Sequence, residues 1–415
     1  MGEDIIYKNI KIGVYAITAS EPTEFIDRWL ESMKGADYIW VLVTKLNDPN
    51  YAYFKEKQKL DEFKDKLFVQ EKEIKPWRFD VARNESYKII DRKCDGLVCT
   101  DIDEVMIEDF WDDYRKAIAE HPNFERIYYR YAWGNDSQSK QPTTCFWYDK
   151  TMHQKGYEWK YPVHEAIVTP GAEEFGWEGQ YFMDNGKIYL YHYPDKTKSR
   201  GSYFDLLKLR NEENPKDLYG YYYLAREYTF YKDWFNCLKS IQPLYNILTV
   251  SPKIPEAEIM FKDRFAFAMT CIMIGQCYMY LGNNVDAEYF FVKAVNDFPS
   301  LLDGYIYLAQ LYAYSNNPQK AREILDLAKK NAKDLVDWRN RQYFWRQWKW
   351  LQIQADALSW ESKYEEALRL FEEAEKDIKT EDDKNFATVE NFYQDKEFVI
   401  NKIKEKQQKR EENKN

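Results

Sequence analysis

The sequence predicts two domains of different class: an α/β domain with a doubly wound parallel sheet over residues 1–200, and an all-α domain of repeated helix pairs over residues 201–378. In the first part, buried strand patterns alternate with helix patterns, which favours a parallel sheet. Strand patterns stop near residue 201, and a repeat of 34 residues follows. The highly charged residues 379–415 are expected to form a helical or disordered tail.

Composition and charge narrow the class of protein. With 45% hydrophobic and 18% aromatic residues among 415, the chain is expected to fold, and its net charge of −10 argues against a nucleic-acid or anionic-membrane binder. The cysteines show no zinc-binding spacing, and Cys99, Cys237 and Cys271 fit apolar patterns as reduced core residues. No signal-peptide pattern or membrane-spanning run is present, so a cytoplasmic location is expected.

The first domain is predicted element by element from its apolar patterns. Residues 10–19 are apolar and β-branched, as a buried first strand is, and Ser20 is expected to cap the following helix. Later segments rich in aromatic residues alternate like antiparallel or edge strands. In chain order the predicted elements are strand 10–19, a helix ending at Gly35, strand 38–44, helix 53–66, strand 67–70, helix 82–92, a strand from Leu97, strands 124–133 and 143–148, and a last strand 187–193.

The strand that starts at Leu97 runs into an acidic stretch that ends at Glu104. Continued strand alternation would point Asp101 and Asp103 the same way and Ile102 into the core. Carboxylates at the carboxyl end of a buried strand suit Mg²⁺ or Mn²⁺ and a substrate that carries phosphates. The alternative is an acidic strand end followed by a helix N-terminus, because Glu104, Glu108 and Asp109 would suit a helix dipole.

The second domain is predicted from its measurable repeat. Small and aromatic residues recur with a period of 34, as in tetratricopeptide repeats, and predict stacked antiparallel helix pairs. Insertions break the phase near residues 246–262 and 330–345. The in-phase positions are Gly275, Tyr278, Ala287, Phe291, Ala294 and Pro299, then Ala309, Tyr312, Ala321, Leu325 and Ala328, with weaker copies at Tyr221, Leu224, Ala225 and Tyr228 and at Ala355, Ala367, Phe371 and Ala374.

Three further places in the first domain carry candidate chemistry. Glu165 is the candidate general base, because a sugar hydroxyl is too weakly acidic to attack unaided; its alternative role is a helix cap or a partner for His164. His192 ends the last predicted strand and is a candidate metal ligand, although an isolated histidine is more often structural. Lys198 and Arg200 follow on a loop that suits a diphosphate, or a solvated hinge.

Arg83 and Asn84 are expected at a helix start just before the acidic strand, where they would hold a nucleotide's phosphate or base. The alternative is an Asn-capped helix with an exposed arginine. The chain contains no G-x-x-x-x-G-K-[ST], G-x-G-x-x-G, G-x-S-x-G or H-E-x-x-H motif. Because these motifs are absent, the sequence does not predict a protein of the commonest kinase, dinucleotide-binding, hydrolase or zinc-protease classes.

The order of these segments resembles the family-2 glycosyltransferases of GT-A fold. The residues that carry the resemblance are Ala82-Arg83-Asn84, Thr100-Asp101-Ile102-Asp103-Glu104, Val163-His164-Glu165 and His192. The chain is similar to the bacterial subgroup with C-terminal tetratricopeptide repeats that includes the sublancin S-glycosyltransferase. That subgroup's final strand histidine, basic loop, Leu-Leu helix and Asn-Pro turn correspond here to His192, Lys198, Arg200, Leu206-Leu207 and Asn214-Pro215.

The resemblance implies an inverting glycosyltransferase that uses a nucleoside-diphosphate sugar, with a UDP-sugar as the first expectation. It implies Mn²⁺ or Mg²⁺ held by Asp103 and His192, with Asp101 near the ribose and Glu165 as the base. Relatives often hold the nucleobase with an Asp in a stretch after the second strand. In residues 43–48 only Thr44 and Asp48 fit that stretch, which leaves the base open. The remaining contacts to the nucleotide sugar would come from Thr18, Thr44, Arg83, Asn84, Lys198 and Arg200.

Partners and competing functions follow from the same residues. A peptide, protein or glycan acceptor is expected, together with a homodimer through the repeat domain, and neither nucleic acid nor a membrane span is expected. Two other functions stay open: a non-catalytic tetratricopeptide scaffold with a vestigial transferase domain, and a metal-dependent sugar nucleotidyltransferase. Four aromatic residues near the end of the repeats are expected to pack as core rather than as an interface: Tyr343, Trp345, Trp348 and Trp350.

Overall fold

The computed structural model describes residues 7–123, 126–133, 145–148, 151–152, 157–168, 180–183, 187–194, 201–250, 265–331, 347–378 and 387–412. The chain forms two compact units, one of residues 1–135 and 145–210 and the other of residues 136–144 and 211–415. The division after Arg210 lies further along the chain than the boundary expected after residue 200. Helix α5 (Tyr203–Glu213) accounts for the difference, because the Arg210 guanidinium donates to the backbone carbonyls of Val163 and His164 at 3.0 and 2.9 Å.

The first unit contains the parallel sheet that the sequence predicts. Strands β1 (Ile12–Thr18), β2 (Tyr38–Val43), β3 (Leu67–Glu71) and β4 (Gly96–Cys99) run parallel, and β8 (Thr151–Met152) pairs antiparallel with β4. The order across the sheet is β3-β2-β1-β4-β8. Because the chain winds to β2 on one side of β1 and to β4 on the other, the carboxyl ends of β1 and β4 form the point where such sheets bind ligands.

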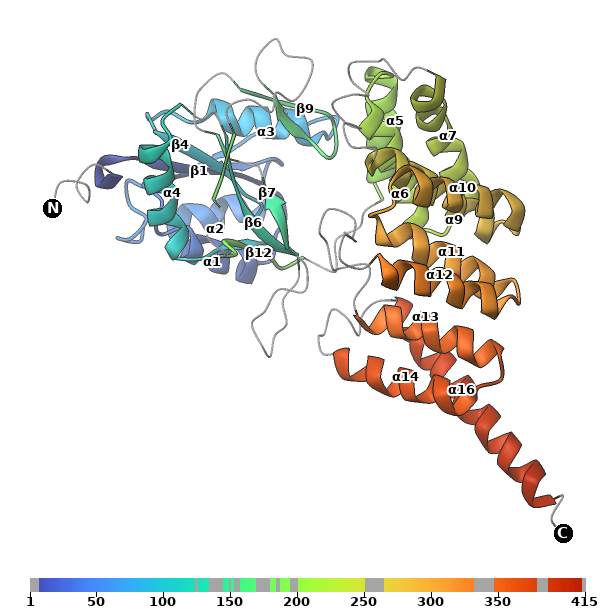
Figure 1. Cartoon of the computed structure of the whole chain (residues 1–415). Helices are drawn as coiled ribbons and strands as arrows, with labels where there is room; N and C mark the ends of the chain where they lie inside the picture. Colours follow the sequence, from blue (N-terminus) through green and yellow to red (C-terminus); the bar gives the residue numbers. More distant parts are fainter. Residues whose placement is uncertain are drawn as a thin grey trace. The chain divides into compact units, whose positions relative to one another are not determined.

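Four helices accompany these strands (Figure 1): α1 (Thr23–Ser32), α2 (Pro49–Lys57), α3 (Phe79–Lys88) and α4 (Asp109–Glu120). Two sequence predictions were wrong here. Ser20 does not cap α1; it has a φ of 55°, and its hydroxyl donates to the Asp48 carboxylate at 2.7 Å. Asp48 accepts the Asn50 N–H at 2.9 Å and so caps α2, which starts four residues before the predicted position and ends at Lys57 rather than at residue 66.

A second sheet follows the acidic segment. It consists of β5 (Glu104–Met106), β6 (Arg126–Trp133), β7 (Cys145–Tyr148), β11 (Gln180–Phe182) and β12 (Leu190–His192), in the order β11-β6-β12-β5 with β7 paired to β6. The β6–β7 pair is antiparallel, as the alternation predicts. Strands β9 (Glu158–Lys160) and β10 (Ala166–Val168) form a separate antiparallel pair. Pairing of β12 with β5 places His192 opposite Glu104.

The second unit consists of helix pairs that follow one another in sequence order (Figure 1). Helices α10 and α12 begin at Asn284 and Pro318, which reproduces the predicted period. The in-phase alanines are buried, and a Cβ added at Gly275 would lie 2.5 Å from the Phe291 ring. The helices are α6 (Leu218–Phe230), α7 (Trp234–Val250), α9 (Phe265–Tyr280), α10 (Asn284–Asp297), α11 (Leu302–Tyr314), α12 (Pro318–Lys330), α13 (Gln347–Trp360), α14 (Tyr364–Asp377) and α16 (Ala387–Glu412).

The first and second helices of each pair are joined by the same kind of turn. The second residue after each first helix is left-handed, at Lys232, Gly282, Asn316 and Ser362 with φ of 56°, 82°, 56° and 61°. In the second turn the Gly282 N–H donates to Met279 at 3.1 Å and the Asn283 N–H to Tyr278 at 2.9 Å. This pattern closes the end of a helix by satisfying its last carbonyls, and its recurrence shows one repeating unit.

The charged C-terminal region is more ordered than a tail. Helix α16 buries Phe392 and Val399 against α13 and α14, because residues seven apart lie on one helix face. Trp348 belongs to this core, as predicted, whereas Tyr343, Trp345 and the side chain of Trp350 lie outside the described residues.

Two expectations about the whole chain are also met. Cys99, Cys237 and Cys271 are buried free thiols. Among the helices that the structure describes, none is long and apolar enough to cross a membrane.

Candidate active site at the carboxyl end of the parallel sheet

Strand β4 ends before the acidic segment, which forms a turn instead of continuing the strand. The Glu104 N–H donates to the Asp101 carbonyl oxygen at 3.1 Å, and the Asp101 N–H donates to the Glu104 carboxylate at 2.8 Å. Ile102 is buried as predicted, but Asp101 and Asp103 contact different partners rather than sharing a strand face. The alternative of an acidic helix start holds in part, because β5 follows Glu104 directly, whereas Glu108 and Asp109 lie at the start of α4.

Arg83 is the centre of a first cluster of side chains, although it is only 1% exposed. Its Nε donates to the Glu165 carboxylate at 3.0 Å, its Nη2 donates to Asp101, and its Nη1 lies 3.2 Å from the Cys99 sulfur. The guanidinium carbon lies 5.5 Å from the centre of the Trp159 ring. A single buried cation therefore joins two carboxylates that come from separate segments of the sequence.

The partners of Arg83 fix its charge. Burial alone would lower the pKa of the guanidinium, but the charges of Asp101 and Glu165 outweigh burial and hold that pKa well above its ordinary value. Arg83 is therefore a permanent cation and supplies a fixed positive charge to both carboxylates.

Arg83 and Asn84 lie in the second turn of α3, because the helix begins at Phe79. The predicted helix start was therefore wrong, and so was the alternative of an exposed arginine. The Asn84 amide donates to the Trp159 carbonyl oxygen at 2.8 Å and accepts the Trp159 N–H at 2.9 Å, which ties β9 to α3. Contact of either residue with a nucleotide stays a prediction.

Asp103 and His192 form a second cluster, as predicted. The Asp103 Oδ2 and the His192 Nε2 are 3.2 Å apart, although the residues are separated by 89 positions in the sequence. The pairing of β12 with β5 brings them together, and the Tyr193 N–H donates to the Asp103 carbonyl oxygen at 2.8 Å. Each cluster includes one residue of the same turn. Asp101 belongs to the first cluster and Asp103 to the second, and only Ile102 lies between them in the chain.

Sequence patterns missed two residues of this site. Glu104 is buried, and the Tyr131 ring on β6 lies 6.0 Å from the His192 ring. Burial, and then the charges of Glu104, Asp101 and Asp103, raise the pKa of the Tyr131 phenol well above its ordinary value. The phenol therefore stays protonated beside the acidic turn. The alternation of β6 offered a signal for Tyr131, but nothing in it indicated the neighbouring carboxylates.

The chemistry of the Asp103–His192 pair fits a divalent ion. A carboxylate oxygen suits Mg²⁺ and Mn²⁺, and an imidazole nitrogen is a common ligand of transition-metal ions. Within the part of the chain that the structure describes, no group of three or more His, Cys, Asp and Glu side chains is arranged to hold a metal. An ion held by this pair would take its other ligands from water and a substrate's phosphates.

The remaining predicted contacts lie along the same edge of the sheet or outside the described residues. Thr18 ends β1 and Thr44 follows β2, and the N–H and hydroxyl of Thr44 donate to the Thr18 carbonyl oxygen at 2.9 and 3.2 Å. Both threonines are buried. They share an edge with Asp101 because carboxyl ends of parallel strands meet at one edge. Lys198 and Arg200 lie outside the described residues.

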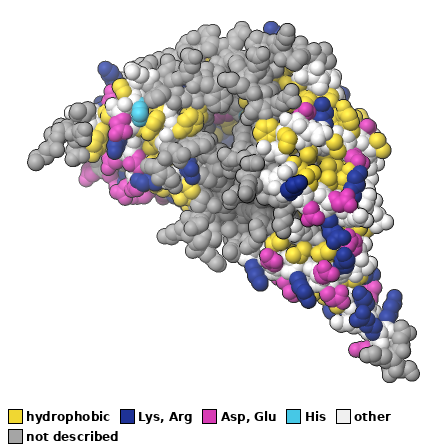
Figure 2. Space-filling view, in the orientation of Figure 1, with side chains coloured by type: hydrophobic (Ala, Val, Ile, Leu, Met, Phe, Trp, Pro, Cys, Tyr) yellow, Lys and Arg dark blue, Asp and Glu magenta, His cyan; other side chains and the backbone are white. Residues whose placement is uncertain are grey.

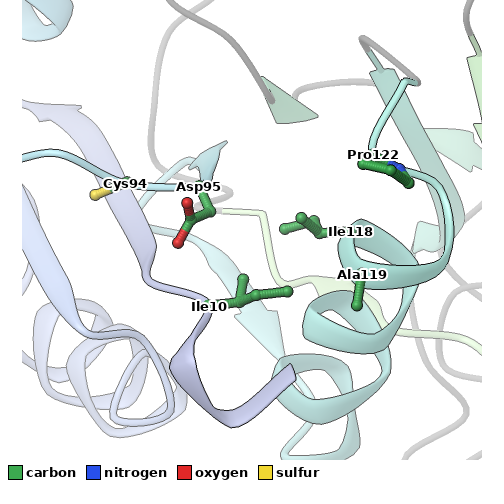
Figure 3. A pocket seen from close by; sticks show the side chains of 6 residues that line it. All are labelled: Ile10, Cys94, Asp95, Ile118, Ala119 and Pro122. Atoms are coloured by element: carbon green, nitrogen blue, oxygen red, sulfur yellow. The ribbon is translucent and has the colours of Figure 1, made fainter. Parts of the chain in front are cut away.

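A pocket lies at the other edge of the sheet (Figure 3). Its lining comes from the segments before β1 and β4 and from the end of α4, through Ile10, Cys94, Asp95, Ile118, Ala119 and Pro122. These residues surround the amino ends of the strands, whereas the charged clusters follow the carboxyl ends. The pocket is therefore separate from the candidate site.

Comparisons with known proteins find similar solved structures among repeat proteins. No family model matches the chain, and no curated protein matches it. A thermophilic TPR protein from Thermus thermophilus is 14% identical, with 47% of this chain and 89% of that chain covered and a TM-score of 0.34. TPR-like repeats of a putative kinesin light chain from Podospora anserina are 17% identical, covering 43% and 86%, with a TM-score of 0.34. The MamA protein is 13% identical, covering 45% and 89%, with a TM-score of 0.30.

Proposed function

We propose that this chain is a metal-dependent, inverting glycosyltransferase that moves a sugar from a nucleoside-diphosphate sugar to a peptide, protein or glycan. The observation that carries the proposal is the Asp103–His192 pair beside the carboxylates linked by Arg83. Asp101 and Asp103 follow the carboxyl end of β4, at the edge where open α/β sheets bind nucleotides. The resemblance of the motif order to family-2 glycosyltransferases of GT-A fold adds support.

The residues of the acidic turn would contact different parts of the donor. A divalent ion held by Asp103 and His192 would offset the charge that develops on the departing diphosphate. The Asp101 side chain is 38% exposed despite its contact with Arg83, so its carboxylate can accept a hydrogen bond from a ribose hydroxyl. Arg83 binds the Asp101 carboxylate and the Glu104 carboxylate accepts the Asp101 N–H, so both contacts hold Asp101 in place.

Glu165 is the proposed general base. Its side chain is 11% exposed, and one of its oxygens accepts the Arg83 Nε–H. The second carboxylate oxygen can receive the proton of the acceptor hydroxyl or thiol, while Arg83 fixes the orientation of the group. We therefore assign Arg83 a positioning role and not a direct contact with the reacting atoms.

The repeat unit is proposed to present the acceptor. Each first helix ends in an exposed aromatic side chain, and Figure 2 shows hydrophobic side chains on the visible face of this unit. The four residues are Phe230, Tyr280, Tyr314 and Trp360, which are 60, 47, 53 and 48% exposed. Exposed aromatic side chains on a rigid repeat suit the recognition of a protein or peptide.

Donor hydrolysis tests the enzymatic part of the proposal. The protein is incubated with Mn²⁺ or Mg²⁺ and a panel of nucleotide sugars, and the released nucleoside diphosphate is measured. Release with one donor, lost on chelation of the metal and reduced roughly 100-fold or more in Asp103→Ala, supports the proposal. Asp95→Ala, at the other edge of the sheet, is the matched control and should retain release.

The same experiment separates the competing functions. If no donor is cleaved and the nucleoside diphosphates do not bind, the scaffold function with a vestigial first domain is favoured. If pyrophosphate is released from a nucleoside triphosphate and a sugar phosphate, the chain is a nucleotidyltransferase. Release of nucleoside diphosphate that Asp103→Ala leaves unchanged would contradict the assigned site.

A further inference from the structure

Arg28 on α1 has two buried hydrogen-bond donors without an acceptor. Its Nε and Nη2 make no hydrogen bond, although both atoms are shielded from solvent. The neighbouring acid Asp27 is engaged elsewhere, since it binds Lys57 Nζ at 2.6 Å and the Tyr53 hydroxyl at 2.8 Å. Buried donors of a charged group are nearly always paired, so this arrangement calls for a partner outside the chain.

The surroundings of Arg28 place it beside the candidate metal ligands. Its guanidinium carbon lies 4.7 Å from the centre of the Phe25 ring and 4.4 Å from the centre of the Tyr193 ring. Tyr193 follows His192 in the chain, and its N–H donates to the Asp103 carbonyl oxygen. The two aromatic rings contact the faces of the guanidinium, and they offer no acceptor to its edge.

We propose that Arg28 binds a phosphate oxygen pair of the donor's diphosphate, next to the ion that Asp103 and His192 would hold. Nε and Nη2 form the side of the guanidinium that matches two oxygens of one phosphate group, and these are the atoms left without partners. This inference rests on the proposed function, because it takes the ligand to be a nucleoside diphosphate.

The ligand reaches the guanidinium by a movement of the arginine side chain. The residue as a whole is partly exposed, so rotation about its side-chain bonds turns the donor edge outward without opening the core. In this state the rings of Phe25 and Tyr193 hold the charged group close to the site. An entering diphosphate then supplies the acceptors that the chain does not.

Binding of nucleoside diphosphates tests the inference without any catalytic step. UDP and GDP are titrated with Mn²⁺ into the full chain by calorimetry, alongside uridine and guanosine. Arg28→Gln should weaken binding of the diphosphate by roughly 10- to 100-fold and leave nucleoside binding unchanged, because it removes a charge-assisted bidentate contact. Arg28→Lys keeps the positive charge but lacks the two parallel N–H donors, so it should weaken diphosphate binding less than Arg28→Gln does.

Arg92 provides a matched control, because it also lies between two aromatic rings. Its guanidinium carbon is 5.3 Å from the Tyr38 ring centre and 4.8 Å from that of Phe68, near the amino ends of β2 and β3. Arg92→Gln should leave diphosphate binding unchanged.

Each outcome of the titrations decides between the two proposals. If the unaltered chain binds neither diphosphate, the proposed function fails, and this inference fails with it. If the unaltered chain binds one of them and Arg28→Gln binds it equally well, only this inference is overturned. An equal loss of nucleoside and diphosphate affinity in Arg28→Gln would also overturn it, because the effect would then not concern the phosphates.

Discussion

At the scale of single residues, the arrangement of the site depends on the Arg83 guanidinium. Replacing it by methionine would leave Glu165, which is 11% exposed, without its cation and would release Asp101 from the same contact. Removing one partner of a buried ion pair costs on the order of 3–5 kcal/mol, because the other charge stays buried and uncompensated. We therefore expect Arg83→Met to unfold at a markedly lower urea concentration, as measured by circular dichroism.

A second substitution tests whether the loss of stability in Arg83→Met comes from the Glu165 carboxylate that is left without its cation. In Arg83→Met combined with Glu165→Gln no unpaired charge is left at residue 165, so part of the lost free energy of unfolding should return. The free energy of unfolding of Arg83→Lys should lie between those of the unaltered chain and Arg83→Met, since a single ammonium keeps the charge but cannot donate to both carboxylates as the guanidinium does. Unfolding of Arg83→Met at the same urea concentration as the unaltered chain would show that the ion pairs do not stabilise this unit.

Sequence patterns identified Asp103 and His192 from their residue types and from a resemblance, and the structure brings them together. They did not predict that Arg83 is buried. The predicted start of α3 lay three residues too late, so Arg83 was expected beside the helix start rather than in the second turn. The difference arises because Phe79 N–H bonds to the carbonyl of Pro162, a contact between distant segments that no local pattern contains.

At the scale of elements, the length of a helix or strand determined whether the sequence could predict it. The long apolar strands were placed within a few residues, and the repeat gave a clear period of 34 residues. Strands β5 and β12 have three residues each, too few to show a period of two. Their pairing creates the Asp103–His192 contact, so the site's assembly was accessible only through the resemblance and not through local patterns.

The recurring helix–helix turns permit a test of backbone strain. Gly282 has a φ of 82°, and a Cβ added there would meet no atom within 4 Å, so Gly282→Ala changes only the backbone preference. We expect it to lower the free energy of unfolding by roughly 1 kcal/mol, because residues with a Cβ avoid this conformation. Thermal unfolding followed by circular dichroism measures the change.

The opposite substitution is the matched comparison for this turn. Ser362 occupies the equivalent position with a φ of 61°, so Ser362→Gly should raise the free energy of unfolding by about 0.5–1 kcal/mol. Changes of the same sign at both positions would contradict a shared turn conformation.

At the scale of the whole molecule, the repeat predicted the architecture of the second unit because each helix pair is a local structure of fixed length. The first unit gave no such period, and its second sheet joins strands from distant parts of the chain. The end of the repeat was predicted least well. Charge dominates the composition after residue 379, and the few apolar residues that bind α16 to α14 are spaced too widely to stand out.

A repeat array needs a terminal element that covers its last hydrophobic face, and α16 fills that role here. Phe392 is buried, with its ring centre 5.4 Å from that of Phe371 and 6.0 Å from that of Trp348. We expect Phe392→Ala to reduce the free energy of unfolding of the second unit by about 3–5 kcal/mol, as measured by urea titration. Phe398 on the same helix is 51% exposed, so Phe398→Ala should change it by roughly 0.5 kcal/mol at most. Equal effects of the two substitutions would mean that α16 is a peripheral helix, and the array would then have to end at α14.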